Sequence, residues 1–239
     1  MSKIHDQWTV LPHGPLVPID EGILTVTGRI HMPLVDLERR MTVVRLKTGG
    51  SVIYSAVALE DDQMAKIEEW GTPRFLIVPG DAHRLDAKIF KQRYPGIRVI
   101  APPGAQAHAR EAVRVDATTG EFADLDVRLE PVPGTEGHEL ALLVRRRSGV
   151  TLILNDLIGN LRRKSGFEGW LLHIMGFGGD APEIPAVAKW MMIKAKDQLR
   201  AQLLQWAAMP GLERIIVSHG EPIEADPTGA LRDLAAGLG

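Results

Sequence analysis

The stretch of residues 73–101 constrains the fold of this chain more than any other part of the sequence. Residues 74–78 and 97–100 form two short runs without polar alternation, separated by a Pro-Gly turn, a loop and a short helix. Strands of this kind are buried on both faces, as in a sheet covered by helices. The loop that follows such a strand lies at its carboxyl end, where α/β proteins place their sites. The candidate residues of this loop are Asp81, His83 and Asp86.

Turn residues and hydrophobic periodicity predict the remaining elements. Strands are expected at residues 23–30, 41–46, 52–59, 127–132, 139–145, 151–154 and 214–218, and helices at residues 60–70, 105–112 and 184–209. Residues 47–50 are predicted to form a hairpin turn, because their two glycines accept positive φ. Residues 1–21 are expected to be irregular, and residues 159–183 to form a long loop typical of a lid or a partner surface. Together these elements predict one α/β (α+β) domain over residues 1–239, with mixed sheets and layers of helices.

Composition excludes several classes of function. The formal net charge is -2 and the lysines and arginines are scattered, which argues against nucleic-acid binding and a polybasic membrane surface. The absence of cysteine excludes disulfides, thiolate nucleophiles and cysteine-ligated metals. Neither a signal peptide nor an apolar window of about 18 residues is visible. We therefore expect a soluble, cytoplasmic protein with no nucleic-acid or membrane partner.

The order of these features resembles the metallo-β-lactamase superfamily. A hairpin-rich N-terminal sheet leads to a helix and a buried strand with a His/Asp loop. A Pro-Gly turn before a strand pair, a strand ending Leu-Asn-Asp and a strand ending Ser-His-Gly come later. The resemblance covers about residues 23–225 and implies an αββα sandwich of two mixed β-sheets flanked by helices. Within the superfamily, the chain is similar to a divergent branch with a decayed metal motif, the DUF4336-like proteins.

The resemblance implies a metal site in which the first ligand cluster is incomplete. That cluster has the form His-x-His-x-Asp-His, and its Asp matches Asp86. Ala82, Arg84 and Ala87 then stand where the three histidines are expected. His83 lies between two ligand positions, so it does not replace them by sequence position alone.

The second half of the family motif is better preserved. The histidine expected after the Pro-Gly turn is replaced by Thr135, with His138 three residues further along. The bridging aspartate matches Asp156, and the final histidine matches His219. The candidate ligands, if a metal is bound, are His83, Asp86, His138, Asp156 and His219. The further residues expected in the pocket are Arg84, Thr135 and His173.

Two functions from different classes remain open. In the first, the chain has lost the binuclear metal site and hydrolase activity, and it binds an unknown small molecule or protein, or forms a homodimer. No cofactor is then expected, and Arg84 fills the metal's space by pairing with Asp86 or Asp156. We favour this hypothesis because a cation at a ligand position repels a divalent ion. In the second, the chain is a metal-dependent hydrolase with a rearranged mononuclear site for one zinc or iron ion, which recruits His83 and His138.

Overall fold

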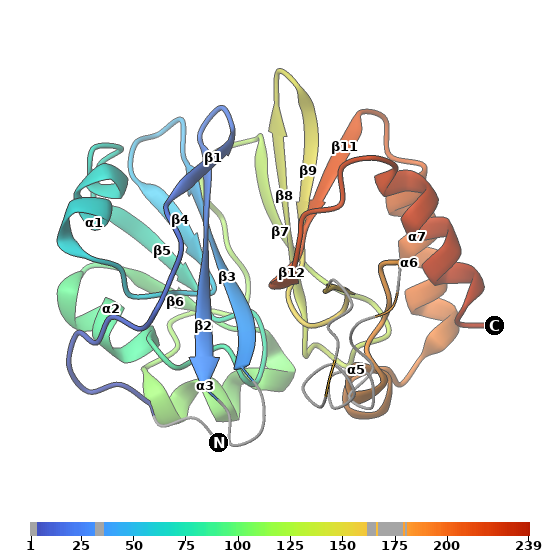
Figure 1. Cartoon of the computed structure of the whole chain (residues 1–239), viewed down its shortest axis with the longest axis horizontal. Helices are drawn as coiled ribbons and strands as arrows, with labels where there is room; N and C mark the ends of the chain where they lie inside the picture. The colour runs from blue at the N-terminus through green and yellow to red at the C-terminus, as the bar shows by residue number, and fades with distance from the viewer. Residues whose placement is uncertain (1–3, 32–35, 162–165, 167–178, 180) are drawn as a thin grey trace.

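The computed structural model describes residues 4–31, 36–161, 166, 179 and 181–239. Two β-sheets face each other, and helices cover the outer face of each sheet (Figure 1). Within the described residues, no helix is both long enough and apolar enough to cross a membrane. The predicted αββα sandwich of two mixed sheets is confirmed.

The first sheet is formed by the N-terminal half of the chain and has six strands in sequence order. Its strands are β1 (Val17–Asp20), β2 (Ile23–His31), β3 (Asp36–Arg45), β4 (Ser51–Tyr54), β5 (Pro73–Ile77) and β6 (Arg98–Ile100). Neighbours from β1 to β4 pair antiparallel, whereas β4, β5 and β6 run parallel. The β3–β4 hairpin turns at Gly49 and Gly50, whose φ angles of 85° and 75° confirm the predicted glycine turn.

The second sheet has four strands in the order β11-β9-β8-β7. Its strands are β7 (Val127–Pro131), β8 (Leu140–Arg146), β9 (Gly149–Ile153) and β11 (Leu212–Ile216). β9 and β11 are parallel, and the other neighbours are antiparallel. A short parallel pair, β10 (Gly159–Asn160) with β12 (His219–Gly220), extends beyond the ends of β9 and β11.

Helices flank the two sheets on opposite sides (Figure 1). The first sheet carries α1 (Asp61–Glu68), α2 (Ala87–Arg93) and α3 (Gln106–Ala112), and a 3₁₀ turn (Pro103–Ala105) leads into α3. The second sheet carries α5 (Ala186–Met191), α6 (Lys196–Ala207) and α7 (Pro227–Ala236). Asp226 caps α7 by accepting a hydrogen bond from the Gly229 backbone N–H, and Pro227 occupies the first helical position.

Three apolar clusters match the three interfaces of the sandwich. One lies between the first sheet and its helices and includes the fully buried Met64, Leu76 and Phe90. The second lies between the sheets and includes Tyr54 and Leu142. The third packs the second sheet against α5, α6 and α7. The apolar layer between the sheets holds the two halves together, and the two outer layers hold the helices on their sheets.

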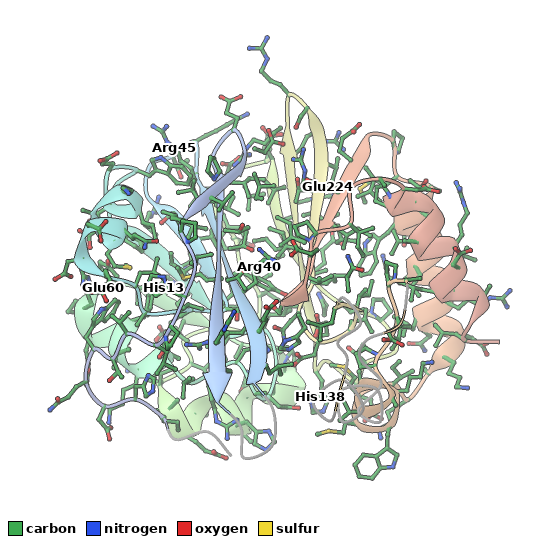
Figure 2. All side chains as sticks on the ribbon, viewed as in Figure 1. His13, Arg40, Arg45, Glu60, His138 and Glu224 are labelled. Carbon is green, nitrogen blue, oxygen red and sulfur yellow. The ribbon has the colours of Figure 1, made fainter. Side chains whose placement is uncertain are left out.

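Arg40 joins the two sheets near the candidate site. From β3 it donates Nη2 to the Gly220 carbonyl at 2.6 Å and Nε to the Val217 carbonyl at 3.2 Å. Figure 2 labels Arg40 in the region where the two halves of the molecule meet. This buried guanidinium therefore holds β12, which contains His219, against the first sheet.

Several sequence predictions need correction. The predicted helix over residues 184–209 is two helices, because the backbone N–H groups of Lys194 and Ala195 donate to the Gly134 carbonyl instead of continuing the helix. Residues 17–20 are a strand, not irregular. The predicted strands at residues 97–100 and 214–218 fall on β6 and β11, which lie at the sheet edges of the described structure and not in the middle of a sheet. The helix α7 was not predicted. Most of the predicted loop 159–183, with His173, lies outside the described residues.

Candidate metal centre

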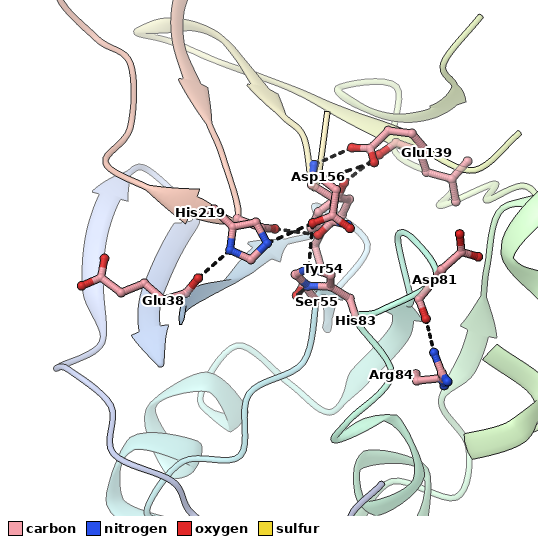
Figure 3. Close-up of polar contacts among 12 residues, drawn as sticks. Glu38, Tyr54, Ser55, Asp81, His83, Arg84, Glu139, Asp156 and His219 are labelled. Atoms are coloured by element: carbon pink, nitrogen blue, oxygen red, sulfur yellow. Dashed lines mark hydrogen bonds and ion pairs between the residues drawn. The ribbon is translucent and has the colours of Figure 1, made fainter. Parts of the chain in front are cut away.

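His83, Asp156 and His219 converge on one point at the edge of the sandwich (Figure 3). The Asp156 Oδ1 atom lies 3.1 Å from His83 Nε2 and 2.9 Å from His219 Nε2. One ligand atom from each residue lies within 4.8 Å of the other two. Among the residues that the structure describes, this is the single cluster of three or more His, Asp and Glu side chains with such spacing.

The topology of the two sheets brings these three residues together. His83 lies in the loop after β5, and Asp156 follows β9 by three residues. His219 opens β12, directly after the run that contains β11. β5 runs parallel to β4, and β9 runs parallel to β11. The carboxyl ends of each parallel pair therefore lie at the same end of their sheet. The three side chains therefore share the position at which α/β proteins place their sites.

A backbone carbonyl orients the His219 ring. The Nδ1 atom of His219 donates to the Glu38 carbonyl at 2.6 Å, so this nitrogen carries a proton. The other ring nitrogen, Nε2, is left to face Asp156. A histidine whose Nδ1–H is held by a carbonyl is the usual arrangement in metal sites, because it presents the Nε2 lone pair to the ion.

Ser55 holds the His83 ring in position, through a hydroxyl that can either donate to or accept from the imidazole. The Ser55 hydroxyl lies 2.7 Å from His83 Nδ1, and His83 Nε2 faces Asp156. Ser55 has a φ of 59°, a conformation that is uncommon for residues other than glycine. It directly follows β4, and its backbone N–H donates to the Ile77 carbonyl of β5. The left-handed backbone is therefore held by the sheet, as is common at functional sites.

The charges of the cluster stabilise one another. Burial would raise the pKa of Asp156, but the charge of His83 and the hydrogen bonds from His219 and His83 hold it well below its ordinary value. Burial would lower the pKa of His219, yet its hydrogen bond and charge interaction with Asp156 raise it. Both histidine side chains are 5% exposed, whereas the Asp156 side chain is 28% exposed. Solvent therefore reaches the cluster from the Asp156 side.

Glu139 holds the chain segment that carries Asp156. Its fully buried carboxyl group accepts the backbone N–H of Asn155 at 2.6 Å and that of Asp156 at 3.3 Å. Burial, with the nearby charge of Asp156, raises the pKa of Glu139 well above its ordinary value. The side chain thus caps the end of β9 and limits the movement of Asp156.

The donor set of the cluster fits a single divalent metal. A zinc ion at about 2.0–2.2 Å from tetrahedrally placed N and O ligands sets those atoms roughly 3.3–3.6 Å apart. The observed separations of 2.9 and 3.1 Å are hydrogen-bond lengths, so a small outward movement of the side chains would give that spacing. Two imidazoles and one carboxylate suit zinc or iron, and three protein ligands leave room for water or substrate.

Asp86 lies outside this cluster in a buried ion pair. Its side chain is 0% exposed and accepts hydrogen bonds from Arg39 Nη2 at 2.5 Å and from the Ala58 backbone N–H at 3.2 Å. Its other oxygen lies 2.7 Å from His5 Nδ1. Both carboxylate oxygens are therefore occupied by protein donors.

The predicted pairing of Arg84 was wrong. Arg84 donates to the Asp81 backbone carbonyl and, at 2.8 Å, to the Glu111 carboxylate. The buried Asp86 does require a cation, as electrostatics dictates, but Arg39 supplies it from β3. Sequence reasoning missed Arg39, His5, Ser55 and Glu139, because each acts through a contact distant in sequence.

His138 and Thr135 contribute to a neighbouring group. His138 Nδ1 and His108 Nδ1 lie 2.9 Å from different oxygens of Asp81. Thr135 is buried, and its hydroxyl donates to the Val132 carbonyl within the turn before β8. Gly80 lets the loop after β5 pack closely against Asp156 and His138. A Cβ on Gly80 would lie 3.4 Å from Asp156 Oδ2 and 3.5 Å from the His138 carbonyl oxygen.

Solved structures with the same architecture cover nearly the whole chain. FIM-1, a metallo-β-lactamase from Pseudomonas aeruginosa in its mono-zinc form, aligns over 95% of this chain and 96% of its own, with a TM-score of 0.61 and 16% identity. DIM-1, a metallo-β-lactamase exposed to ceftazidime, aligns over 97% and 100% of the two chains, with a TM-score of 0.63 and 11% identity. The chain has the metallo-β-lactamase fold.

Other metallo-β-lactamase-fold structures agree. The metallo-β-lactamase from Pontibacter korlensis aligns over 92% of this chain and 98% of its own, with a TM-score of 0.62 and 12% identity. No protein-family model matches the sequence, and no curated protein sequence matches it. At these identities the likeness establishes the metallo-β-lactamase fold, and the chemistry has to be argued from the site itself.

Proposed function

We propose that this chain is a metal-dependent hydrolase with a rearranged mononuclear site formed by His83, Asp156 and His219. The observation that carries the proposal is the convergence of two histidine Nε2 atoms on one carboxylate oxygen. The opposite ring nitrogen of each histidine is already engaged, by Ser55 and by the Glu38 carbonyl. Such pre-oriented ligands are typical of metal centres.

A single ion, rather than a pair, fits the rest of the pocket. Three of the four residues at the first ligand cluster are Ala82, Arg84 and Ala87, none of which is a metal ligand under ordinary conditions. The fourth, Asp86, is consumed by Arg39 and His5. These substitutions support placing the chain in a divergent branch with a decayed binuclear motif. The mono-zinc form of FIM-1 is a precedent for one zinc ion in this fold.

The chain's own residues would organise the reaction. When bound, a zinc ion supplies Lewis acidity and a nucleophilic water at neutral pH. His83 and His219 would hold the ion, and Asp156 would neutralise part of its charge while its exposed side leaves the cluster accessible. Glu139 keeps Asp156 in place through the backbone of the β9 end. The neighbours are β-lactamases by name, so β-lactams are the first substrate class to test, followed by esters and phosphoesters.

The experiment is metal analysis of protein purified without chelator. We expect about one zinc or iron ion per chain, lost in His83→Ala and in His219→Ala. His13→Ala is the matched control, because His13 lies in the N-terminal segment and its ring contacts the neighbouring Gly14 carbonyl, away from the cluster. Hydrolysis of the substrate panel should follow the metal content of each variant.

The competing function is a non-catalytic binding protein without metal. One observation favours it: Asp156 can be satisfied by hydrogen bonds from both histidines with no ion present. This alternative would be established if protein purified without chelator contained no metal, and if the His83→Ala, His219→Ala and His13→Ala variants had the same metal content as the wild type. Activity that is unaffected by loss of the metal would also contradict the proposed hydrolase.

A further inference from the structure

A second feature lies away from the candidate metal centre, at the turns of both sheets. A cavity of about 650 Å³ is bounded by the β1–β2 turn, the β3–β4 hairpin and the β8–β9 hairpin. Its lining contains five cationic side chains, namely Arg45, Lys47, Arg145, Arg146 and Arg147, against the two acidic residues Glu21 and Asp126. Its volume falls in the range of small-molecule sites, about 300–1,000 Å³.

Arg146 makes this cavity a built structure. Its guanidinium donates to three backbone carbonyls, those of Glu21 at 2.9 Å, Arg45 at 2.8 Å and Arg145 at 2.9 Å. These bonds tie the tip of the second sheet to the tip of the first. Gly22 permits the close approach, because its φ is 69° and a Cβ there would lie 3.3 Å from Arg45 Cβ. The acceptors of Arg146 are neutral carbonyls, and no carboxylate of the described residues lies within ion-pair distance of its guanidinium.

The remaining arginines are also not neutralised. Within the described residues, Arg45, Arg145 and Arg147 have no carboxylate within ion-pair distance. Lys47 is the exception, since it pairs with Asp126. The hydrogen bond to Lys47 and the charges of Arg146 and Arg145 lower the pKa of Asp126, consistent with a positive local field. Four guanidinium groups thus line one cavity, and their total positive charge is larger than the negative charge of the two acidic residues there.

We propose that this cavity binds a compact oligophosphate anion, as free oligophosphate or as the phosphate chain of a nucleotide. Planar guanidinium groups bind phosphate oxygens in bidentate pairs, and a phosphate chain carries more negative charge in a short length than a single peptide carboxylate. Several arginines on a small, rigid surface suit a ligand that concentrates three or more negative charges in a short chain. The site is separate from His83, Asp156 and His219, so the inference does not depend on the proposed hydrolase.

The test is calorimetric titration of the full chain at low ionic strength with inorganic triphosphate and, separately, with ATP. Arg45→Gln and Arg145→Gln remove charge without removing a hydrogen bond within the protein, and each should weaken binding about tenfold, the effect of one charge-assisted hydrogen bond. Arg200→Gln, on the exposed face of α6, is the matched control and should bind like the wild type. Added salt should weaken binding steadily.

The two ligands separate the sources of the phosphate chain. Equal affinity for triphosphate and ATP supports recognition of the phosphate chain alone, and tighter binding of ATP supports a nucleotide ligand. His219→Ala should leave both affinities unchanged. Binding that is lost in His219→Ala but retained in Arg45→Gln would place the anion at the candidate metal centre and overturn the proposal. Absence of binding at millimolar concentrations of both ligands would overturn it as well.

Discussion

Arg39→Met tests the electrostatics of the buried ion pair between Arg39 and Asp86. The Asp86 side chain is 0% exposed, and Arg39 is its cationic partner at 2.5 Å. Removing one partner of a buried pair costs about 3–5 kcal/mol, because the other charge stays buried. The substitution also removes the Arg39 hydrogen bond to the Ala56 carbonyl. His5 and the Ala58 N–H remain, which keeps the expected loss near that range rather than above it.

The assay is urea unfolding with the m-value compared between variants. In a parallel thermal unfolding experiment, a loss of about 3–5 kcal/mol should lower the Tm of a domain of this size by roughly 6–20 °C. Arg39→Met combined with Asp86→Asn should recover part of the loss, because the uncompensated charge is gone. Arg84→Ala is the matched control, and it should cost about 1 kcal/mol or less, since its carboxylate partner Glu111 is half exposed. A loss below about 1 kcal/mol for Arg39→Met, or equal losses for both arginines, would refute the reasoning.

Three further changes test the link between the sheets and the surrounding charges. Arg40→Met should destabilise the protein by about 2–4 kcal/mol in urea unfolding, because it leaves two buried backbone carbonyls without a donor; a loss below about 1 kcal/mol would show that water replaces it. Gly220→Ala should cost about 2 kcal/mol or more in thermal unfolding, since φ is 102° and its Cβ would meet the Asn160 carbonyl at 2.0 Å; an unchanged Tm would contradict this geometry. Burial would raise the pKa of Asp20, but hydrogen bonds from a serine hydroxyl and Arg214 lower it below its ordinary 3.8. The pair therefore stabilises the protein above that pH and the contribution is lost in acid, so Asp20→Asn should reduce stability near neutral pH more than in acid; an equal loss at both pH values would be inconsistent with that shift.

The layered fold could be predicted because its signals are local. Apolar runs without polar alternation gave the buried strands, and glycines at residues 49 and 50 gave the hairpin. The division of residues 184–209 into α5 and α6 could not be predicted in this way, because the acceptor that interrupts the helix is the Gly134 carbonyl, about sixty residues earlier in the chain. The cap of α7, Asp226 followed by Pro227, is a local signal that was present and overlooked.

The candidate site could be predicted only in its chemical requirements. Asp156 and His219 were found by position in the family motif, whereas His83 joined them through the path of the loop after β5. A buried Asp86 needed a cation, but its source was Arg39, on a strand distant in sequence. The adjacent pair Arg39 and Arg40 carried a signal for this: neighbours on a strand point to opposite faces, and β3 is covered on both. One arginine therefore serves the helical side and the other the interface between the sheets.

The most direct test of the mononuclear centre is a calorimetric titration of chelator-treated protein with zinc. The proposed site predicts one ion per wild-type chain and no comparable binding in His83→Ala or His219→Ala, with His13→Ala behaving as the wild type. Two ions per chain, no binding at all, or a stoichiometry of one that survives both histidine substitutions would contradict it.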